Sequence, residues 1–291
     1  MSPQNATADR PPSWASKTYA GYFFDLDGTI YLGDRLLPGV SKLFDWLVSN
    51  GLPYAFVTNN PTKSVAEYEQ RLGRMGLAAE GRVITSATAT ANWLNTYRPG
   101  AVVYPISEPP LEQTLRDAGI EISDDPAKID IVIASFDRSF DYAKLDIAFR
   151  AIVEEDRAIL VATNPDRYCP MSDRLGVPDT AAIIGAIEGC TQVKCAHVFG
   201  KPSPALVEIS AEILGVELEN SVMVGDRIYT DIAMAINAGM DGALVLSGDC
   251  TLDEVLSCQT DDRPQICMES IDQLIPRDVN AAQIYGLGIP N

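Results

Sequence analysis

The chain has 291 residues, of which 46% are hydrophobic and 21% are charged, as is usual for a soluble globular protein. Its net charge of −18 disfavours nucleic acid and anionic membranes as partners, because both are polyanions. No apolar run approaches the ~20 residues of a membrane span. Residues 1–17 lack the basic start and apolar stretch of a secretory signal, so we expect a cytoplasmic protein.

The remaining composition excludes several kinds of catalytic site. No cysteine pair forms Cys-x-x-Cys, and no cysteine is followed six residues later by arginine, as the cysteine phosphatases require. The single histidine, His197, cannot supply a multi-histidine metal site. No Gly-x-Ser-x-Gly segment occurs, which excludes that form of serine nucleophile.

Short apolar runs alternate with amphipathic segments, which predicts an α/β protein with a parallel sheet covered by helices. Residues 1–19 are expected to form a disordered tail. The pattern predicts strands at 22–24, 54–57, 101–104, 129–134, 159–162, 197–199, 221–224, 242–246 and 265–268. It predicts helices at 40–50, 64–75, 86–96, 110–118, 142–154, 180–190, 203–214, 229–238 and 270–275.

Polar, glycine-rich strand ends occur before residue 65 and after residue 195. This spacing indicates a core interrupted by an insertion of roughly 90 residues, which is an ordinary domain size. Ligands of an open parallel sheet bind beyond the carboxyl ends of its strands, so these strand ends are the candidate site.

Two carboxylates, Asp25 and Asp27, directly follow the aromatic strand at 22–24, and Gly28 comes next. Such a pair is costly near a buried strand end unless a cation or a proton offsets the charge, and a nucleophile with an acid/base partner would need this pairing. An ordinary Asp-Gly turn explains the same residues equally well.

Three further strand ends carry polar residues. Thr58 and Asn59 could hold phosphate oxygens, although an ordinary loop before a helix is the simpler interpretation. Lys201 could neutralise an anion or be a solvated surface residue. Asp226 is placed to bind a hard cation and Asp231 lies on the first helical turn, but both acids could merely favour a helix N-terminus.

Asp25-x-Asp27-Gly-Thr, Thr58-Asn59, Lys201 and Gly225-Asp226-x4-Asp231 occur in the order of the four motifs of the haloacid dehalogenase (HAD) superfamily phosphatases. The chain resembles its NagD / para-nitrophenylphosphatase-like subfamily, which has a class IIA cap; the segments 57–61, 163–166 and 199–204 are typical of it. The resemblance covers roughly residues 20–276. It implies a Rossmann-like parallel-sheet core over 20–86 and 179–291, with an α/β cap domain inserted over 87–178.

The resemblance implies a role for each motif residue. Asp25 would attack phosphorus and form an aspartyl-phosphate, and Asp27 would move the proton. Mg²⁺ would be held by Asp25, the backbone carbonyl of Asp27, and Asp226. Phosphate-binding residues would be Thr58, Asn59 through its N–H, and Lys201, while Asp231 would orient Lys201 or the waters of the metal.

The cap loop at 166–174 is where this subfamily places residues that select the substrate; here they are Asp166, Arg167, Tyr168 and Arg174. For any one of them, an exposed loop with incidental charges is the slightly simpler interpretation. The expected activity is Mg²⁺-dependent hydrolysis of a small phosphomonoester. A sugar or polyol phosphate is favoured because the loop is polar and has few aromatic residues for stacking on a base.

Several alternatives remain open. The substrate could instead be a nucleoside monophosphate, phosphoglycolate or pyridoxal phosphate, and phosphotransfer to an alcohol could compete with hydrolysis. A non-catalytic protein that binds phosphorylated metabolites is a further class, but it has no need for two repelling carboxylates. The resemblance also allows a homodimer.

Overall fold

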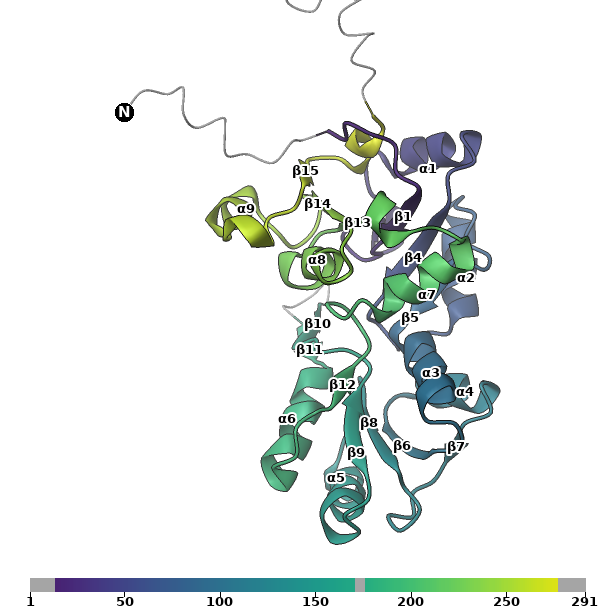
Figure 1. Ribbon diagram of the computed structural model, residues 1–291, viewed down its shortest axis with the longest axis vertical. Coiled ribbons are helices and arrows are strands. Elements are labelled where there is room, and N and C mark those ends of the chain that lie inside the picture. The colour runs from purple at the N-terminus through teal and green to yellow at the C-terminus, as the bar shows by residue number, and fades with distance from the viewer. Residues whose placement is uncertain (1–13, 171–175, 277–291) are drawn as a thin grey trace, which may run out of the picture. The chain divides into compact units, whose positions relative to one another are not determined.

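The computed structural model describes residues 14–170 and 176–276. The chain divides into two compact units, a first unit of Met1–Tyr54 with Leu214–Asn291 and a second unit of Ala55–Ile213 (Figure 1). Among the described residues, no helix combines the length and the apolar character that crossing a membrane requires.

The first unit is built on four parallel strands in the order β15-β14-β13-β1. Their bounds are Gly21–Phe24 (β1), Ser221–Gly225 (β13), Asp241–Val245 (β14) and Ile266–Met268 (β15). Phe24 pairs with Val224. The residues that follow β1 and β13 therefore emerge side by side at one edge of the sheet.

Three short α-helices belong to the described part of the first unit. They are α1 (Val40–Ser49), α8 (Ala233–Asn237) and α9 (Leu252–Ser257), with 3₁₀ turns at Leu218–Asn220, Thr260–Asp262 and Ile271–Leu274. A small hairpin joins β2 (Tyr31–Leu32) to β3 (Arg35–Leu36). The helix predicted at 229–238 is a π-helical turn, Ile228–Ile232, followed by α8.

Part of the segment predicted to be a disordered tail packs on the first unit. Ala15 and Tyr19 are buried. The Ala15 N–H donates to the carbonyl of Gln273 at 3.1 Å, and the Tyr19 hydroxyl donates to the Asp241 carboxylate at 2.9 Å. Residues 14–19 are therefore ordered against this unit, whereas residues 1–13 lie outside the described residues.

The second unit contains two sets of parallel strands. At its boundary, β4 (Tyr54–Thr58) pairs with β5 (Val83–Thr85). A five-stranded parallel sheet has the order β12-β9-β8-β6-β7, with bounds His197–Val198, Ile159–Ala162, Ile131–Ala134, Val102–Ile106 and Glu121–Ile122. A separate antiparallel pair joins β10 (Tyr168–Pro170) to β11 (Gly176–Pro178).

Six helices among the described residues belong to the second unit or end at its boundary. They are α2 (Val65–Arg74), α3 (Ser86–Tyr97), α4 (Pro109–Asp117), α5 (Tyr142–Phe149), α6 (Thr180–Thr191) and α7 (Ala205–Leu214). A π-helical turn, Arg150–Glu154, extends α5. Parallel strands covered by helices in both units confirm the predicted α/β class.

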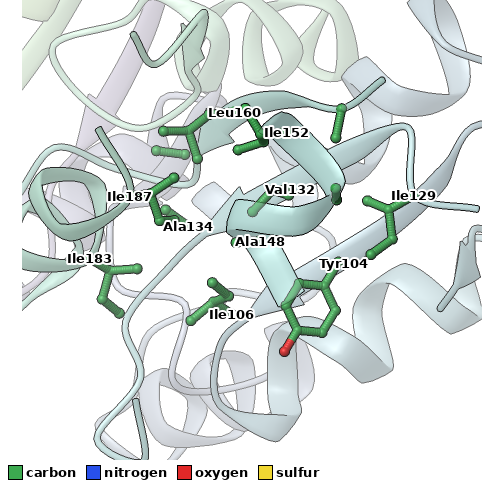
Figure 2. Packing of buried hydrophobic residues seen from close by; sticks show 13 residues of the cluster. Tyr104, Ile106, Ile129, Val132, Ala134, Ala148, Ile152, Leu160, Ile183 and Ile187 are labelled. Carbon is green, nitrogen blue, oxygen red and sulfur yellow. The ribbon is translucent and has the colours of Figure 1, made fainter. Parts of the chain in front are cut away.

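Helices α5 and α6 bury apolar side chains against the five-stranded sheet. Ala148 from α5 and Ile183 and Ile187 from α6 lie in one cluster with Val132 of β8 and Leu160 of β9 (Figure 2). Strand β12 extends the same sheet, since His197 pairs with Val161. Residues 180–198 thus pack on this sheet although the sequence assigns them to the core domain; the domain division as a whole stays a prediction.

The buried cluster of the second unit gives a test of stability. We expect Ile187→Ala to lower the free energy of unfolding by about 2–5 kcal/mol, because Ile187 is fully buried and its loss leaves a cavity. Ile213→Ala is the matched control, since Ile213 also lies in a helix but is 57% exposed, and its effect should stay within about 0.5 kcal/mol. Urea unfolding followed by circular dichroism measures both; equal effects would contradict the packing described.

Candidate active site

Asp25 leaves the carboxyl end of β1, directly beside β13. Its N–H donates to the carbonyl of Val224 at 2.9 Å, which continues the parallel ladder by one residue. Asp226 follows the last residue of β13. Sheet register alone therefore brings these two acids together, although they are 201 positions apart in the sequence.

A tight turn after Asp25 depends on Gly28. The N–H groups of Thr29 and Ile30 donate to the carbonyl of Leu26, and Gly28 has a φ of 87°, in the left-handed region that disfavours side chains. A Cβ at Gly28 would also lie 2.3 Å from Oδ2 of Asp226. Glycine is required here both for the turn and for the close approach of the Asp226 carboxylate.

Asp25, Asp226 and Asp231 form a buried carboxylate cluster in the first unit. One oxygen of each lies within 4.8 Å of the others, and the residues are only 8%, 3% and 1% exposed. The Asp249 N–H donates to Asp226 Oδ2 at 2.8 Å, and the Arg227 N–H donates to Asp231 Oδ2 at 3.0 Å. The other Asp226 oxygen, Oδ1, is buried and accepts no hydrogen bond from the described part of the chain.

This cluster has the properties of a site for a hard divalent cation. Burial, and then the charges of Asp25 and Asp231, raise the pKa of Asp226 to about 8, which reflects the cost of charging it without a counter-ion. An oxygen-only donor set with a buried oxygen left over suits Mg²⁺ or a similar ion. The residues present therefore fit such a metal.

A loop that the sequence interpretation missed holds this cluster in place. Ser247 donates through its hydroxyl to the carbonyl of Gly28 at 2.8 Å, and the Asp249 backbone binds Asp226 as described above. A Cβ at Gly248 would lie 1.9 Å from Asp226 Oδ2. The sequence signal was present, because Ser-Gly-Asp follows a predicted strand as the other motifs do.

Asp27 differs from the three clustered carboxylates in its exposure to solvent. It is exposed in the first unit, and its backbone forms an isolated bridge with Tyr31. The exposed carboxyl can exchange protons with solvent, which suits an acid/base group. Its role stays a prediction.

In the second unit, Thr58, Asn59 and Lys201 are all buried. Thr58 ends β4 and accepts a hydrogen bond on its hydroxyl from the N–H of Asn60 at 3.2 Å. Asn59 and Lys201 are brought together by direct hydrogen bonds: the Lys201 N–H donates to Asn59 Oδ1 at 2.6 Å. The second and third sequence motifs therefore meet within one unit.

Two family models match the parts of the chain that carry the four motifs. A haloacid dehalogenase-like hydrolase model matches residues 22–121, and a HAD-hydrolase-like model matches residues 198–274. An acid sugar phosphatase of Staphylococcus epidermidis is 36% identical over 242 residues, which are 83% of this chain and 92% of that protein. The chain belongs to the haloacid dehalogenase-like hydrolases.

Solved structures agree with this membership. A 4-nitrophenylphosphatase from Thermotoga maritima has a TM-score of 0.81 and 31% identity over 88% of this chain and 95% of its own. NagD from Escherichia coli K-12 has a TM-score of 0.79 and 28% identity over 89% and 99% of the two chains. The NagD / para-nitrophenylphosphatase-like resemblance is thereby confirmed, with its Rossmann-like HAD fold, and the enzyme is a phosphoric monoester hydrolase.

In this hydrolase the residues predicted to select the substrate have different surroundings. Asp166 is partly buried and accepts hydrogen bonds from Asn59 Nδ2 at 3.1 and 3.2 Å. Arg167 is exposed, and Tyr168 is partly buried at the start of β10. Arg174 lies outside the described residues. The substrate-selecting role of these residues stays a prediction.

The carboxylate cluster predicts a specific response to metal. At about 100 times its Kd, Mg²⁺ should stabilise the wild type by about 2.7 kcal/mol and raise Tm by roughly 5 °C. Asp226→Asn should lose this response, because it replaces one charged donor. Gly248→Ala should weaken it, because the new Cβ displaces the Asp226 carboxylate.

Thermal unfolding with and without Mg²⁺ measures these shifts. Asp45→Asn is the matched control, since Asp45 is exposed on α1 and should leave the shift unchanged. If Asp226→Asn showed the full Mg²⁺ response, Asp226 would not be a ligand of the metal.

Proposed function

We propose that this protein is a Mg²⁺-dependent phosphomonoester hydrolase that forms an aspartyl-phosphate on Asp25 and acts on a small sugar or polyol phosphate. The observation that carries the proposal is the buried cluster of Asp25, Asp226 and Asp231, in which Asp226 Oδ1 accepts no hydrogen bond from residues 14–170 and 176–276. A bound cation would offset the repulsion in this cluster and would place positive charge beside the residue in the nucleophile position.

The metal would be held by the carboxylates of Asp25 and Asp226 and by the backbone carbonyl of Asp27. Bound there, Mg²⁺ would offset the negative charge of the nucleophile and of the phosphate that approaches it. Asp231, fixed by the N–H of Arg227, would orient the surroundings of the metal without being a ligand itself.

Hydrolysis would proceed in two steps. In the first, a carboxylate oxygen of Asp25 bonds to phosphorus while the ester P–O bond breaks, and Asp27 gives its proton to the departing oxygen. In the second, Asp27 takes a proton from water, the water oxygen bonds to phosphorus, and the bond between phosphorus and Asp25 breaks. Inorganic phosphate is released, and both acids return to their first states.

Phosphate oxygens would be bound by the Thr58 hydroxyl, the Asn59 N–H and the Lys201 ammonium group, which stabilise charge that spreads over them in the transition state. These three residues belong to the second unit. Their assignment is supported by motif order within the family. With it we propose the division into a core over 20–86 and 179–291 and an inserted cap over 87–178, except that α6 and β12 pack on the five-stranded sheet formed mainly by the cap segment.

Two observations support a sugar or polyol phosphate. The curated relative described above is named an acid sugar phosphatase. The segment at 166–168 also offers Arg167 and Tyr168, which are polar groups able to bind hydroxyls. A homodimer and a cytoplasmic location stay predictions.

Asp25→Asn tests the nucleophile. It should abolish turnover of an aryl phosphate with Mg²⁺ present while leaving the circular dichroism spectrum unchanged, because the amide is nearly isosteric but cannot attack phosphorus. Asp45→Asn should keep wild-type activity. Near wild-type turnover in Asp25→Asn, or full activity in excess chelator, would refute the mechanism.

A panel of phosphomonoesters tests the substrate class. We expect kcat/KM to be highest for sugar and polyol phosphates, with phosphoglycolate, pyridoxal phosphate and nucleoside monophosphates lower, and phosphate release should depend on added Mg²⁺. A clear preference for a nucleotide would contradict the substrate class without affecting the role of Asp25. Comparing released phosphate with newly formed phosphoester separates hydrolysis from phosphotransfer.

A further inference from the structure

The side chain of Asn59 pairs with the main chain of Lys201 at two points. Oδ1 accepts the Lys201 N–H at 2.6 Å, and Nδ2 donates to the Lys201 carbonyl at 3.1 Å. An amide that satisfies both polar groups of one residue fixes the position of its Cα. The direction in which the Lys201 side chain leaves the backbone therefore depends on Asn59.

Asp166 determines which way this amide faces. Asn59 Nδ2 donates to both carboxylate oxygens of Asp166, at 3.2 and 3.1 Å. A carboxylate and a carbonyl can only accept, and the Lys201 N–H can only donate. Turning the amide over would place Oδ1 against two acceptors and leave the N–H without its bond, so one orientation is chemically allowed.

Other buried groups hold the backbone of these residues. The carbonyl of Asn59 accepts from the Ser86 hydroxyl at 2.6 Å and from Asn164 Nδ2 at 3.2 Å. Oδ1 of Asn164 accepts the N–H of Asp166 at 2.9 Å. Ser86 and Asn164 are fully buried. Asn59 and Asp166 are thus held relative to each other through their backbones as well as through their side chains.

Gly200 allows the chain before Lys201 to approach this network closely. Its N–H donates to the carbonyl of Thr163 at 2.7 Å. A Cβ at this position would lie 2.6 Å from Asn59 Oδ1 and 2.8 Å from the Thr163 carbonyl oxygen. The loops at 58–61, 163–166 and 199–202 are therefore packed backbone to backbone around one amide.

We propose that Asn59 is a positioning residue for Lys201, and that Asp166 orients the Asn59 amide and does not select the substrate. This inference rests on the phosphate-binding role proposed for Lys201. It assigns to the Asn59 side chain a task separate from that of its N–H. It also predicts that Asp166 affects all substrates alike, because its carboxylate acts through Asn59.

Asn59→Asp tests the positioning. The new carboxylate would face the Asp166 carboxylate and the Lys201 carbonyl, and the displaced Lys201 should lower kcat about 100-fold while KM changes little. Asp166→Asn removes one charge-assisted acceptor and should lower kcat about tenfold, by the same factor for every phosphomonoester in the panel. Asn95→Asp is the matched control, since Asn95 is an exposed asparagine of α3.

The double variant N59D/D166N gives the sharpest readout. The amide at position 166 can donate to the carboxylate at position 59, which removes the charge clash, so kcat should exceed that of N59D by about tenfold. If each substitution only disturbed the structure, the two losses of kcat would add, and the double variant would show no rescue. Thermal unfolding of each variant shows that it is folded, and D166N alone still tests the inference if N59D does not fold.

The outcomes separate this inference from the proposed function. Wild-type kcat in Lys201→Ala would overturn the role of Lys201 and this inference with it. A low kcat in Lys201→Ala with a wild-type kcat in N59D would overturn this inference alone. A change of substrate ranking in D166N, or the absence of rescue in the double variant, would also overturn it.

Discussion

Mutual repulsion among three buried carboxylates is the constraint on which the first unit depends. Two full charges at 4.8 Å repel by about 3.5 kcal/mol when the effective dielectric constant is near 20, and burial adds a desolvation cost to each. The chain nevertheless brings Asp25, Asp226 and Asp231 together and gives two of them backbone donors. A proton or a cation can offset this repulsion, and the cluster therefore fits the metal-dependent reaction proposed above.

In the second unit, hydrogen bonds hold the loops around Asn59. The Asn59 oxygen accepts from the Lys201 N–H, and the Asn59 nitrogen donates to Asp166 and to the Lys201 carbonyl. The polar atoms of this amide are therefore satisfied without an added ion. Such a network is rigid, because any shift breaks several bonds in a buried region. Under the proposed function, the carboxylate cluster would bind the cation and this network would position Lys201. Both would serve phosphoryl transfer, where catalysis is mostly positioning and charge stabilisation.

Much of this could be predicted from the sequence, because strands with apolar runs and acids at their ends leave a local signal. The apolar runs place Asp25 and Asp226 at strand ends, and the register of β1 and β13 brings the two acids together. Contacts between distant side chains leave no such signal. Neither the Asn59–Asp166 pair, 107 residues apart, nor the approach of Gly248 to Asp226 follows from spacing or periodicity. The packing of α6 on the five-stranded sheet was missed for the same reason, since an amphipathic helix does not specify which sheet it covers.

The position of Asp166 divides the segment after β9 into two parts with different tasks. Asn164 and Asp166 direct polar side-chain atoms toward Asn59, so their hydrogen bonds hold the loop at 58–61. Arg167 is the next residue and is exposed. A substrate that contacts Arg167 or Tyr168 would contact the residues that directly follow Asp166. Through Asp166 it could affect the Asn59 amide, which we propose positions Lys201. If Arg167 or Tyr168 binds the non-reacting part of the substrate and Lys201 binds its phosphate, as proposed, one short segment connects the two contacts, and binding energy can act on the reacting centre through it.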